Sequence, residues 1–379
     1  NADNVNQLGL AWYADMTERG QWQSTPVMVD GRIYVTTPWT LTAHGGAERI
    51  VKAAQGGALP SLLTPEDLRE YRAVEREPVC GPFLAYRICT VAPPSYGGIF
   101  LLQVLQMMQA RSGGRYDFED PQFTHLFIEA SKLARADRSA YVGDPDFVAV
   151  PTQGLVSSGY VRERADSIDA REAHAAMAGT PPGAKAASAV DHGSMMGGTS
   201  QLTIADADGD IVAMTTTINL GFGSGIMVDG FILNDVLVNF SAAPRHGATI
   251  ANGMAPHKRP FTSMAPAIVF DAQGRPVAAG GSAGGGRIPD YVAQGWIDIL
   301  ANHHTPAHAV SMGHVTTADA GKIVLEKGTD ATRLADELRA RGHPIDIAPL
   351  LSGAGYIERE GGGWIGAADP RRGGNAAGF

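Results

Sequence analysis

The sequence lacks the features of a membrane-spanning or nucleic-acid-binding chain. It has no run of about 18 apolar residues, the length that a membrane-spanning helix needs. Its formal net charge is -9, whereas a nucleic-acid groove needs a basic surface. Hydrophobic residues make up 44% and charged residues 18% of the 379 positions. This composition is typical of a globular chain with one large layered domain or two ordinary domains.

Cysteine is also scarce, and the two cysteines are Cys80 and Cys89. Two cysteines are too few for a disulfide framework or a cysteine-based zinc site. We therefore expect both to be free thiols in strands or in the core, where cysteine behaves as a small hydrophobic residue. The chain begins at Asn1 and shows no signal-peptide pattern, so we expect a processed start or a fragment.

Three polar clusters are more simply explained by structure than by ligand binding. His303, His304 and His308 have no carboxylate at ligand spacing, so we expect a solvated helix end there. Residues 144–146 (DPD) lack the twelve-residue calcium-loop pattern and predict a turn. The pair at 371–372 (RR) is most simply a surface pair near the end of the chain. We expect no metal and no cofactor.

Residues 1–41 differ in character from the rest of the chain. Two apolar runs, 27–29 (VMV) and 33–35 (IYV), flank Asp-Gly at 30–31 and predict a β-hairpin. The segment resembles the N-terminal blade of quinoprotein alcohol dehydrogenases; the matching pieces are 4–5 (NV), 7–12 (QLGLAW), 25–26 (TP), 30–31 (DG) and 34–35 (YV). A propeller needs at least four blades and no further blade follows. We therefore expect a quinoprotein-like β segment joined to a different protein.

Residues 42–198 alternate predicted helices and strands. Thr64 is expected to cap a helix that starts at Pro65. Residues 79–80 and 86–91 predict a strand pair. The other expected elements are a turn at 93–98 (PPSYGG), a buried helix over 99–110, a helix over 125–136 and a flexible linker over 179–194.

Residues 199–379 are rich in strands at first. Runs 201–205 and 211–218 flank 206–209 (DADG) and predict a hairpin. A late helix is expected over 332–341, with Gly342 just beyond its end.

The junction between the linker and this strand-rich part carries the clearest chemical signal. Gly197 and Gly198 are followed at once by Thr199. A glycine pair leaves the peptide bond accessible, so the Thr199 hydroxyl can attack the Gly198 carbonyl and shift the acyl group from nitrogen to oxygen. Hydrolysis of that ester would free a Thr199 α-amine, whose ordinary pKa of about 7.7–8 lets it act as base to its own Oγ.

A series of motifs in a fixed order resembles the gamma-glutamyltransferase family over about residues 44–379. The motifs are 63–68 (LTPEDL), 93–98 (PPSYGG), 134–141 (ARADRSAY), 143–147 (GDPDF), 199–203 (TSQLT), 258–266 (KRPFTSMAP), 281–287 (GSAGGGR) and 368–372 (ADPRR). The resemblance implies an α/β chain with the four-layer αββα sandwich of N-terminal-nucleophile hydrolases. It further implies a zymogen that cleaves itself into the end of a large subunit, 42–198, and a small catalytic subunit, 199–379. Part of the large subunit would be lacking.

Catalytic roles carry over to matching positions. The resemblance implies Thr199 as the nucleophile and Thr217, in 215–219 (TTTIN), as the residue that hydrogen-bonds the nucleophile and its amine. Gly284 and Gly285 would form the oxyanion hole, where glycine lets backbone N–H groups approach a tetrahedral oxyanion closely. The glycine-rich run does not have the spacing of a phosphate-binding loop.

Substrate-binding roles carry over in the same way. Asn219 would hold the glutamyl group, and Thr262 with Ser263 would bind the substrate α-carboxylate. Asn239 stands where the family has an acidic residue for the substrate α-ammonium, and Val236 replaces a polar contact. An amide offers an ammonium ion only a neutral dipole. This site would suit a dicarboxylic acyl group, such as glutaryl, better than a free α-amino group.

Three further departures from the family bear on activity. Residues 199–203 read TSQLT where the family has T-T-H-x-S, the 242–257 segment is shorter than the usual lid loop, and an arginine that clamps the glutamyl carboxylate has no counterpart. Three functions therefore stay open. They are a gamma-glutamyl amide hydrolase or acyltransferase with glutathione-type donors, a glutaryl-type cephalosporin acylase, and an inactive truncated or fused remnant. The first two would use water or an amino acid or peptide as acceptor, and family resemblance implies a periplasmic or secreted location.

Overall fold

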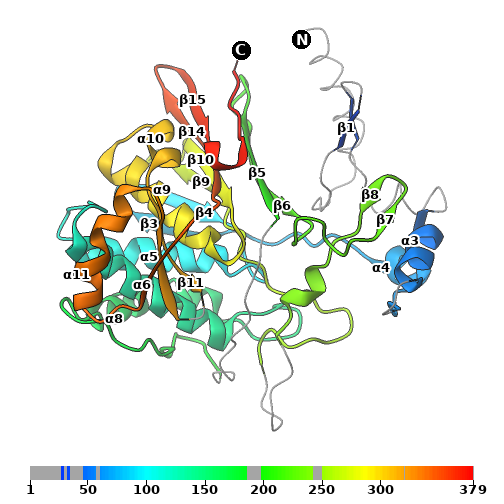
Figure 1. Cartoon of the computed structure of the whole chain (residues 1–379), viewed down its shortest axis with the longest axis horizontal. Coiled ribbons are helices and arrows are strands. Elements are labelled where there is room, and N and C mark those ends of the chain that lie inside the picture. Colours follow the sequence, from blue (N-terminus) through cyan, green and yellow to red (C-terminus); the bar gives the residue numbers. More distant parts are fainter. Residues whose placement is uncertain are drawn as a thin grey trace. The chain divides into compact units, whose positions relative to one another are not determined.

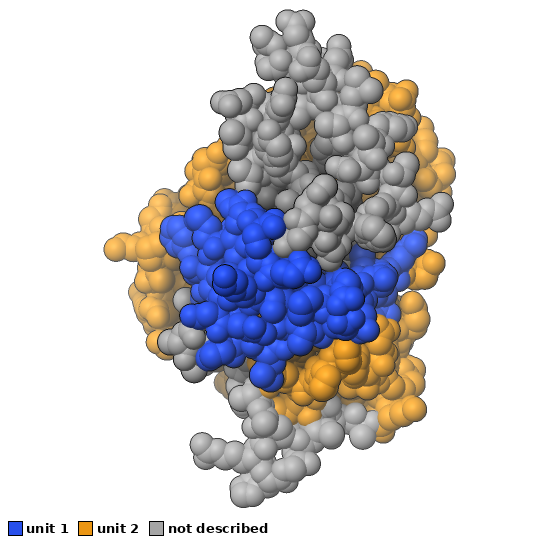
Figure 2. Space-filling model, turned by 90° about the vertical axis from the view of Figure 1, so that its right-hand side faces the viewer, with its two compact units in different colours: residues 1–76, 216–236 blue, residues 77–215, 237–379 orange. Residues whose placement is uncertain are grey.

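The computed structural model describes residues 27–29, 32–34, 46–56, 60–185, 198–241, 250–319 and 321–378. The chain divides into two compact units, which are coloured separately in Figure 2. One unit consists of Asn1–Arg76 with Thr216–Val236, and the other of Glu77–Thr215 with Leu237–Phe379.

The smaller unit contains short elements. Strands β1 (Val27–Val29) and β2 (Arg32–Tyr34) pair antiparallel, with Val27 opposite Tyr34, so the hairpin predicted there is confirmed. The other residues of the first 45 lie outside the described part, and the likeness to a quinoprotein blade stays a prediction. The unit also holds α3 (Gly46–Gln55), α4 (Pro65–Glu70), β7 (Met227–Val228) and β8 (Phe231–Ile232).

Helix α4 begins as its sequence predicts. The Thr64 hydroxyl accepts the Asp67 amide at 3.3 Å, and the Asp67 carboxylate accepts the Thr64 amide at 2.7 Å. This reciprocal capping box satisfies two amides that the first helical turn leaves without partners. Pro65 occupies the first helical position, where its missing N–H costs no hydrogen bond.

The larger unit is built on a six-stranded sheet in which the pairings are antiparallel (Figure 1). Its spatial order is β15-β14-β10-β9-β4-β3. The strands are β3 (Val79–Phe83), β4 (Tyr86–Thr90), β9 (Ala267–Phe270), β10 (Pro276–Ala283), β14 (Gly353–Glu360) and β15 (Gly363–Ala368). The order brings the hairpin β3–β4 beside strands that follow it by almost 180 residues, so the sheet depends on long-range pairing.

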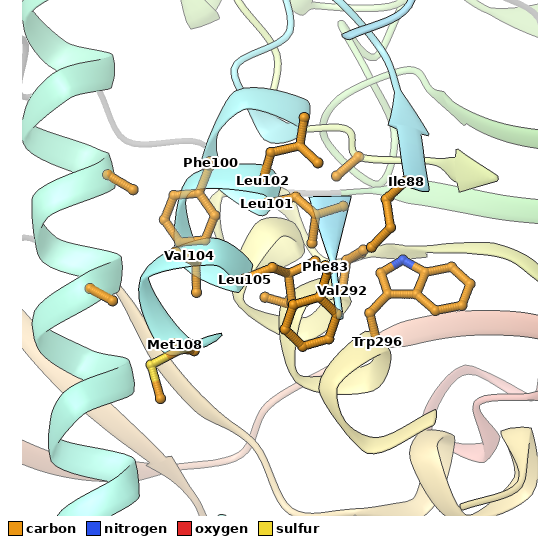
Figure 3. Close-up of a cluster of buried hydrophobic side chains, with 14 of the residues drawn as sticks. Phe83, Ile88, Phe100, Leu101, Leu102, Val104, Leu105, Met108, Val292 and Trp296 are labelled. Carbon is orange, nitrogen blue, oxygen red and sulfur yellow. The ribbon is translucent and has the colours of Figure 1, made fainter. Parts of the chain in front are cut away.

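Helices α5 (Gly97–Arg111) and α9 (Ile288–Asn302) build the hydrophobic core on this sheet. Figure 3 shows Leu101 and Leu105 of α5 close to Phe83 of β3 and Trp296 of α9. The predicted buried helix over 99–110 is thereby confirmed. The predicted helix over 125–136 is part of the longer α6 (Pro121–Tyr141), which Asp120 caps by accepting the Gln122 amide at 2.9 Å. Two short helices follow, α7 (Thr152–Leu155) and α8 (Ser158–Asp166).

Strands β5 (Thr199–Ala205) and β6 (Ile211–Thr217) form the predicted hairpin, and β5 packs on the sheet. An ideal Cβ on Gly281 would lie 2.5 Å from Oε1 of Gln201 in β5. A Cβ on the neighbouring Gly280 would lie on the other face of the sheet, against Tyr356. There Tyr356 packs on Trp296 of α9. The unit therefore stacks helices, a main sheet and β5 in that order, and the expected α/β fold is confirmed.

The C-terminal part adds a small three-stranded sheet. It consists of β11 (Val315–Asp319), β12 (Lys322–Glu326) and β13 (Ile345–Ala348) in the order β11-β12-β13. The helix predicted over 332–341 is split into a 3-10 turn (Asp330–Leu334) and α11 (Ala335–Ala340). It ends as predicted at Gly342, whose φ of 92° is easy only for glycine. Helix α10 (Pro306–Ser311) and three more 3-10 turns, Val236–Asn239, Gly285–Arg287 and Pro370–Arg372, complete the described elements.

The expectation of two free thiols is wrong. Cys80 lies opposite Cys89 in the β3–β4 pair, and the two form a disulfide. The cause is the hairpin register: Phe83 pairs with Tyr86 across a two-residue turn, so positions three residues further along each strand also face one another. The placement of both cysteines in strands was predicted correctly.

Within the described residues, no helix is both long and apolar enough to cross a bilayer.

Candidate active site

Thr199 is the first residue of β5 and is buried, with 7% of its surface exposed. It follows Gly198 directly, as the proposed cleavage requires, while residues 186–197 lie outside the described part. The Arg372 side chain holds this strand end: Nη1 donates to the Thr199 carbonyl at 3.2 Å and Nε donates to the Leu351 carbonyl at 2.9 Å. The rigid guanidinium fork thereby ties the start of β5 to the residues just before β14.

The prediction of a surface pair at 371–372 is wrong for Arg371 and right for Arg372, which is exposed. Arg371 is largely buried and pairs with Glu326 at 2.5 Å and with Asp369 at 3.2 Å. Burial acts to raise the pKa of Glu326, but hydrogen bonds from His314 and Arg371 hold that pKa below its ordinary value. The two arginines anchor the C-terminal segment beside Thr199 because their partners come from distant parts of the chain.

Gly284 and Gly285 lie where β10 ends and helix α9 approaches. Gly284 has a φ of 142° and Gly285 a φ of 61°, a region that other residues rarely adopt. Gly284 precedes the 3-10 turn Gly285–Arg287, which Gly285 opens and which leads straight into α9. Amides at the first turn of a helix have no intrahelical acceptor, and the helix dipole favours negative charge there. This loop is therefore chemically suited to hold an oxyanion.

A chain of contacts connects Thr199 to this loop. Gly353 pairs with Ala283, the last residue of β10. An ideal Cβ on Gly353 would lie 2.9 Å from Cβ of Ala283 and 2.9 Å from Cδ of Arg372. Arg372 thus contacts Thr199 and lies beside Gly353, whose pairing partner Ala283 leads into Gly284.

Thr262 and Ser263 lie beside the same loop. The Ser263 hydroxyl donates to the Gly285 carbonyl at 2.7 Å and is buried. The Thr262 Oγ1 is also buried, and among the described residues it has no hydrogen-bond partner. A buried hydroxyl without a partner loses its hydration, so it favours a polar ligand. The predicted carboxylate-binding pair and the predicted oxyanion loop are therefore neighbours.

The turn at 93–98 supports this pair, a role that the sequence did not reveal. Ser95 Oγ donates to the Met264 carbonyl at 2.6 Å, and the Tyr96 amide donates to the Thr262 carbonyl at 2.9 Å. An ideal Cβ on Gly97 would lie 2.3 Å from the Ser263 carbonyl oxygen, so only glycine fits. The PPSYGG motif was available as a signal, but its partners are more than 160 residues away.

Asn239 ends the 3-10 turn Val236–Asn239 and is buried. Asn252 fixes this segment by donating from Nδ2 to the Asn239 carbonyl at 2.7 Å and to Ser241 Oγ at 3.0 Å. Its Oδ1 accepts the Phe261 amide at 2.8 Å. Asn252 therefore links Asn239 to the residue that precedes Thr262, a connection that sequence reasoning missed.

Thr217 and Asn219 belong to the smaller unit. The Thr217 hydroxyl accepts the Asn219 amide at 2.8 Å. Asn219 is buried and has a φ of 75°, a left-handed conformation that asparagine tolerates better than most residues. The roles expected of these two residues stay predictions.

The histidine cluster has a carboxylate after all, so that expectation is wrong. Asp298, six residues before His304, lies within hydrogen-bond distance of both His304 and His308. The rest of the expectation fits the geometry, since His303 ends α9 in a left-handed conformation and is exposed.

Comparison with known proteins gives a family match over most of the chain. The family model described as Gamma-glutamyltranspeptidase matches residues 44–379. The glutathione hydrolase proenzyme of Escherichia coli K12 is 34% identical over 86% of this chain and 56% of its own length. The acylase ACY 1 proenzyme of Pseudomonas sp. strain SE83 is 33% identical over 79% of this chain and 50% of its own length. The chain spans about half the length of these relatives.

A solved structure agrees with the fold. The crystal structure of cephalosporin acylase from Bacillus halodurans matches with a TM-score of 0.73 and covers 96% of this chain and 65% of its own. Its sequence identity to this chain is 23%, so this likeness supports the architecture alone.

Proposed function

Because the chain belongs to the gamma-glutamyltranspeptidase family, we propose that it is a self-processing amide hydrolase and acyltransferase with Thr199 as its nucleophile. The proposal divides the chain at the start of β5, into 42–198 as the end of a large subunit and 199–379 as the small catalytic subunit. Residues 1–41 stay a separate β segment in this division.

Self-processing would begin with attack of Thr199 Oγ on the Gly198 carbonyl carbon. The C–N bond between the two residues breaks, the acyl group moves to Oγ as an ester, and the former amide nitrogen becomes the Thr199 α-amine. Water then hydrolyses the ester and leaves Gly198 with a free carboxylate. The new amine sits on the same residue as the hydroxyl it must deprotonate, which removes the need for a separate base.

Turnover would use the same hydroxyl. The α-amine accepts the Oγ proton while Oγ attacks the amide carbonyl of the donor. The amides of Gly284 and Gly285 would stabilise the oxyanion that forms, and the leaving amine takes the proton from the α-ammonium group. Water completes hydrolysis of the acyl-Thr199 ester, and an amino acid or peptide amine would complete transfer. Thr217 is proposed to hydrogen-bond the nucleophile and its amine.

The contact of Arg372 with the Thr199 carbonyl carries the proposal. It supports a role for Thr199 because the same side chain lies beside Gly353, which pairs with Ala283 directly before Gly284. A threonine that merely opened a strand would not need its carbonyl fixed by a residue from the end of the chain.

We propose gamma-glutamyl amides as the first donor class. The partnerless Thr262 hydroxyl can donate to an α-carboxylate. The adjacent Ser263 hydroxyl is proposed to turn from the Gly285 carbonyl to the same carboxylate when the donor binds, and Asn219 is proposed to contact the glutamyl group. The E. coli relative carries the name glutathione hydrolase, which agrees with a gamma-glutamyl donor.

A glutaryl-type acylase is the second candidate, and Asn239 favours it. An amide at this position offers a donor ammonium no charge partner, and a glutaryl group has no ammonium to accommodate. A relative of similar identity is named an acylase.

Turnover of two chromogenic donors tests the proposal on the 379-residue chain. Gamma-glutamyl-4-nitroanilide and glutaryl-4-nitroanilide are compared in the wild type and in Thr199→Ala. We expect release of 4-nitroaniline from at least one donor in the wild type and from neither in Thr199→Ala. A folded wild-type chain that turns over neither donor would be the inactive remnant instead.

A further inference from the structure

The C-terminal end of α9 carries a side-chain cluster that the proposed reaction does not use. Asp298 lies in the last turns of α9 and is 3% exposed. One carboxylate oxygen lies 2.8 Å from Nδ1 of His304, and the other lies 2.7 Å from Nδ1 of His308. Both histidine side chains are about half exposed, and their rings lie 4.2 Å apart.

The charge balance of this cluster is unusual. Buried carboxylates are normally paired with a cation or bound to a metal. Within the described part of the chain, the ion-pair partners of Asp298 are these two imidazoles, and neither lysine nor arginine joins them. The three ligand atoms lie within 4.8 Å of one another. Two histidines and one carboxylate form a common ligand set for zinc.

We propose that Asp298, His304 and His308 form a binding site for a divalent transition metal such as Zn²⁺. On binding, each Nδ1 gives up its proton and donates its lone pair to the metal, and the exposed Nε2 carries the remaining N–H. Tetrahedral zinc, with ligands at about 2.0–2.1 Å, separates neighbouring ligand atoms by about 3.3 Å. The rings therefore move outward by about half an ångström, which their exposure permits, and water fills the fourth position.

A second cluster of similar composition is not suited to bind a cation. His125, Glu129 and His343 are buried and close together. The Lys132 ammonium already lies 2.5 Å from Glu129, and Nδ1 of His125 and Nε2 of His343 are joined by a hydrogen bond of 2.8 Å. A resident ammonium and a mutual histidine bond leave no room for a cation, so the two clusters are physically distinct.

The position of the site indicates a structural role. Gly285 and Asp298 lie at opposite ends of the helical segment that leads into and includes α9. At a rise of 1.5 Å per residue, about 20 Å separates the two. A metal here would join the end of α9 to α10, which carries His308, and would stabilise that corner without entering the amide chemistry proposed above.

Zinc binding to matched asparagine variants tests the site. The 379-residue chain and the variants His303→Asn, His304→Asn and His308→Asn are titrated with ZnCl₂ against a chromophoric chelator. Asparagine keeps an N–H donor near the position of Nδ1, so it preserves the hydrogen bond to Asp298 but is a poor zinc ligand. His303→Asn is the control, since His303 is an adjacent exposed histidine outside the cluster and asparagine tolerates its left-handed backbone.

We expect one zinc ion per chain, with affinity at least about tenfold weaker in His304→Asn and His308→Asn and unchanged within about twofold in His303→Asn. Zinc at 100 times its dissociation constant should raise the Tm of the wild type and of His303→Asn by about 3 °C. Zinc should not change the turnover of the two donors by the wild type or by His303→Asn. Absence of zinc binding, or binding that survives both ligand substitutions, would overturn the proposal. If zinc changed turnover without raising the Tm, the proposed structural role would be overturned.

Discussion

At the scale of single residues, Gly284 is the position where backbone geometry bears most directly on chemistry. Its φ is 142°, and an ideal Cβ would lie 2.5 Å from Cε2 of Tyr291. Gly284→Ala must therefore shift either the loop amides or the first turn of α9. We expect kcat to fall by about 10²–10³, the usual loss when one oxyanion donor is misplaced. Turnover of the chromogenic donors measures this directly.

Gly274→Ala is the matched control for that substitution. Gly274 also has a positive φ, 77°, but an added Cβ would meet nothing within 4 Å. Its substitution strains the β9–β10 turn by about 1 kcal/mol and leaves the loop at Gly284 unchanged. Equal losses of turnover in the two variants would show that the Gly284 effect is one of stability rather than of oxyanion geometry.

Asn239 determines the choice of donor in this account. Hydrogen bonds to charged groups contribute about 1.5–3 kcal/mol, and a neutral partner recovers only part of that. Asn239→Asp should therefore shift the ratio of kcat/KM towards the gamma-glutamyl donor, by roughly tenfold for each 1.4 kcal/mol regained. The ratio is measured with the gamma-glutamyl and glutaryl anilides in both forms. A ratio that stays unchanged would mean that Asn239 does not face the donor ammonium.

Single-residue roles were only partly predictable from the sequence. Thr262 and Ser263 were singled out by their motif, and Ser263 does contact Gly285. Arg372 was taken for a surface residue because its partner is distant in the sequence, and Asp298 was overlooked as a partner of the histidines. Arg372 reaches Thr199 from the far end of the chain, and Asp298 meets its histidines only because the chain reverses after α9.

At the scale of elements, the features that depend on adjacent residues were predicted correctly. The Thr64 cap, the hairpin around 206–209 and the stop at Gly342 depend on a few adjacent residues, and each is present. The split of the late helix was missed, since tertiary packing decides between 3-10 and α geometry in so short a segment. The Cys80–Cys89 bond was missed although the two-residue turn between β3 and β4 fixes that register.

The disulfide should contribute measurably to stability. It closes a loop of about ten residues, for which the chain-entropy relation gives about 2–3 kcal/mol. The double variant Cys80→Ala, Cys89→Ala should lower the free energy of unfolding by that amount in a urea titration. A reductant should lower the stability of the wild type and leave the double variant unaffected. Equal stability of the oxidised wild type and the double variant would contradict this expectation.

At the scale of the whole molecule, the sheet order and the contacts between distant segments were not predictable from single-sequence patterns. Strand β10 pairs with β9 and β14, and β9 pairs with β4, which precedes it by more than 170 residues. Such pairings are set by how the elements pack together. The α/β class followed from the family resemblance, whereas no sequence pattern indicated the contact of β5 with Gly281.

The buried position of His343 predicts how the free energy of unfolding depends on pH. Burial, with the charges of His125, Lys132 and Arg341, lowers the pKa of His343 to about 3. Its unfolded pKa is about 6.5, so between these values the unfolded state binds a proton that the folded state refuses. The stabilisation is complete above about pH 6.5 and is lost as pH falls towards 3, by up to about 1.4 kcal/mol per pH unit.

His343→Gln tests this pH dependence. Glutamine can still donate to Nδ1 of His125 from a position near that of Nε2, and it does not titrate. The variant should lose stability less steeply than the wild type between about pH 6 and 4. Glu129, whose carboxylate lies 3.9 Å from Nδ1 of His343, and the buried His125 are present in both proteins. Identical slopes in urea titrations across this range would contradict the assignment to His343.

Intact-mass measurement with N-terminal sequencing of the purified 379-residue chain tests whether the protein cleaves itself at Thr199. We expect two fragments of 198 and 181 residues, the second beginning Thr-Ser-Gln-Leu-Thr. Thr199→Ala should stay a single chain of 379 residues. A wild-type chain that is folded and active but stays uncleaved, or one cut at another bond, would contradict the assignment of Thr199 as the nucleophile.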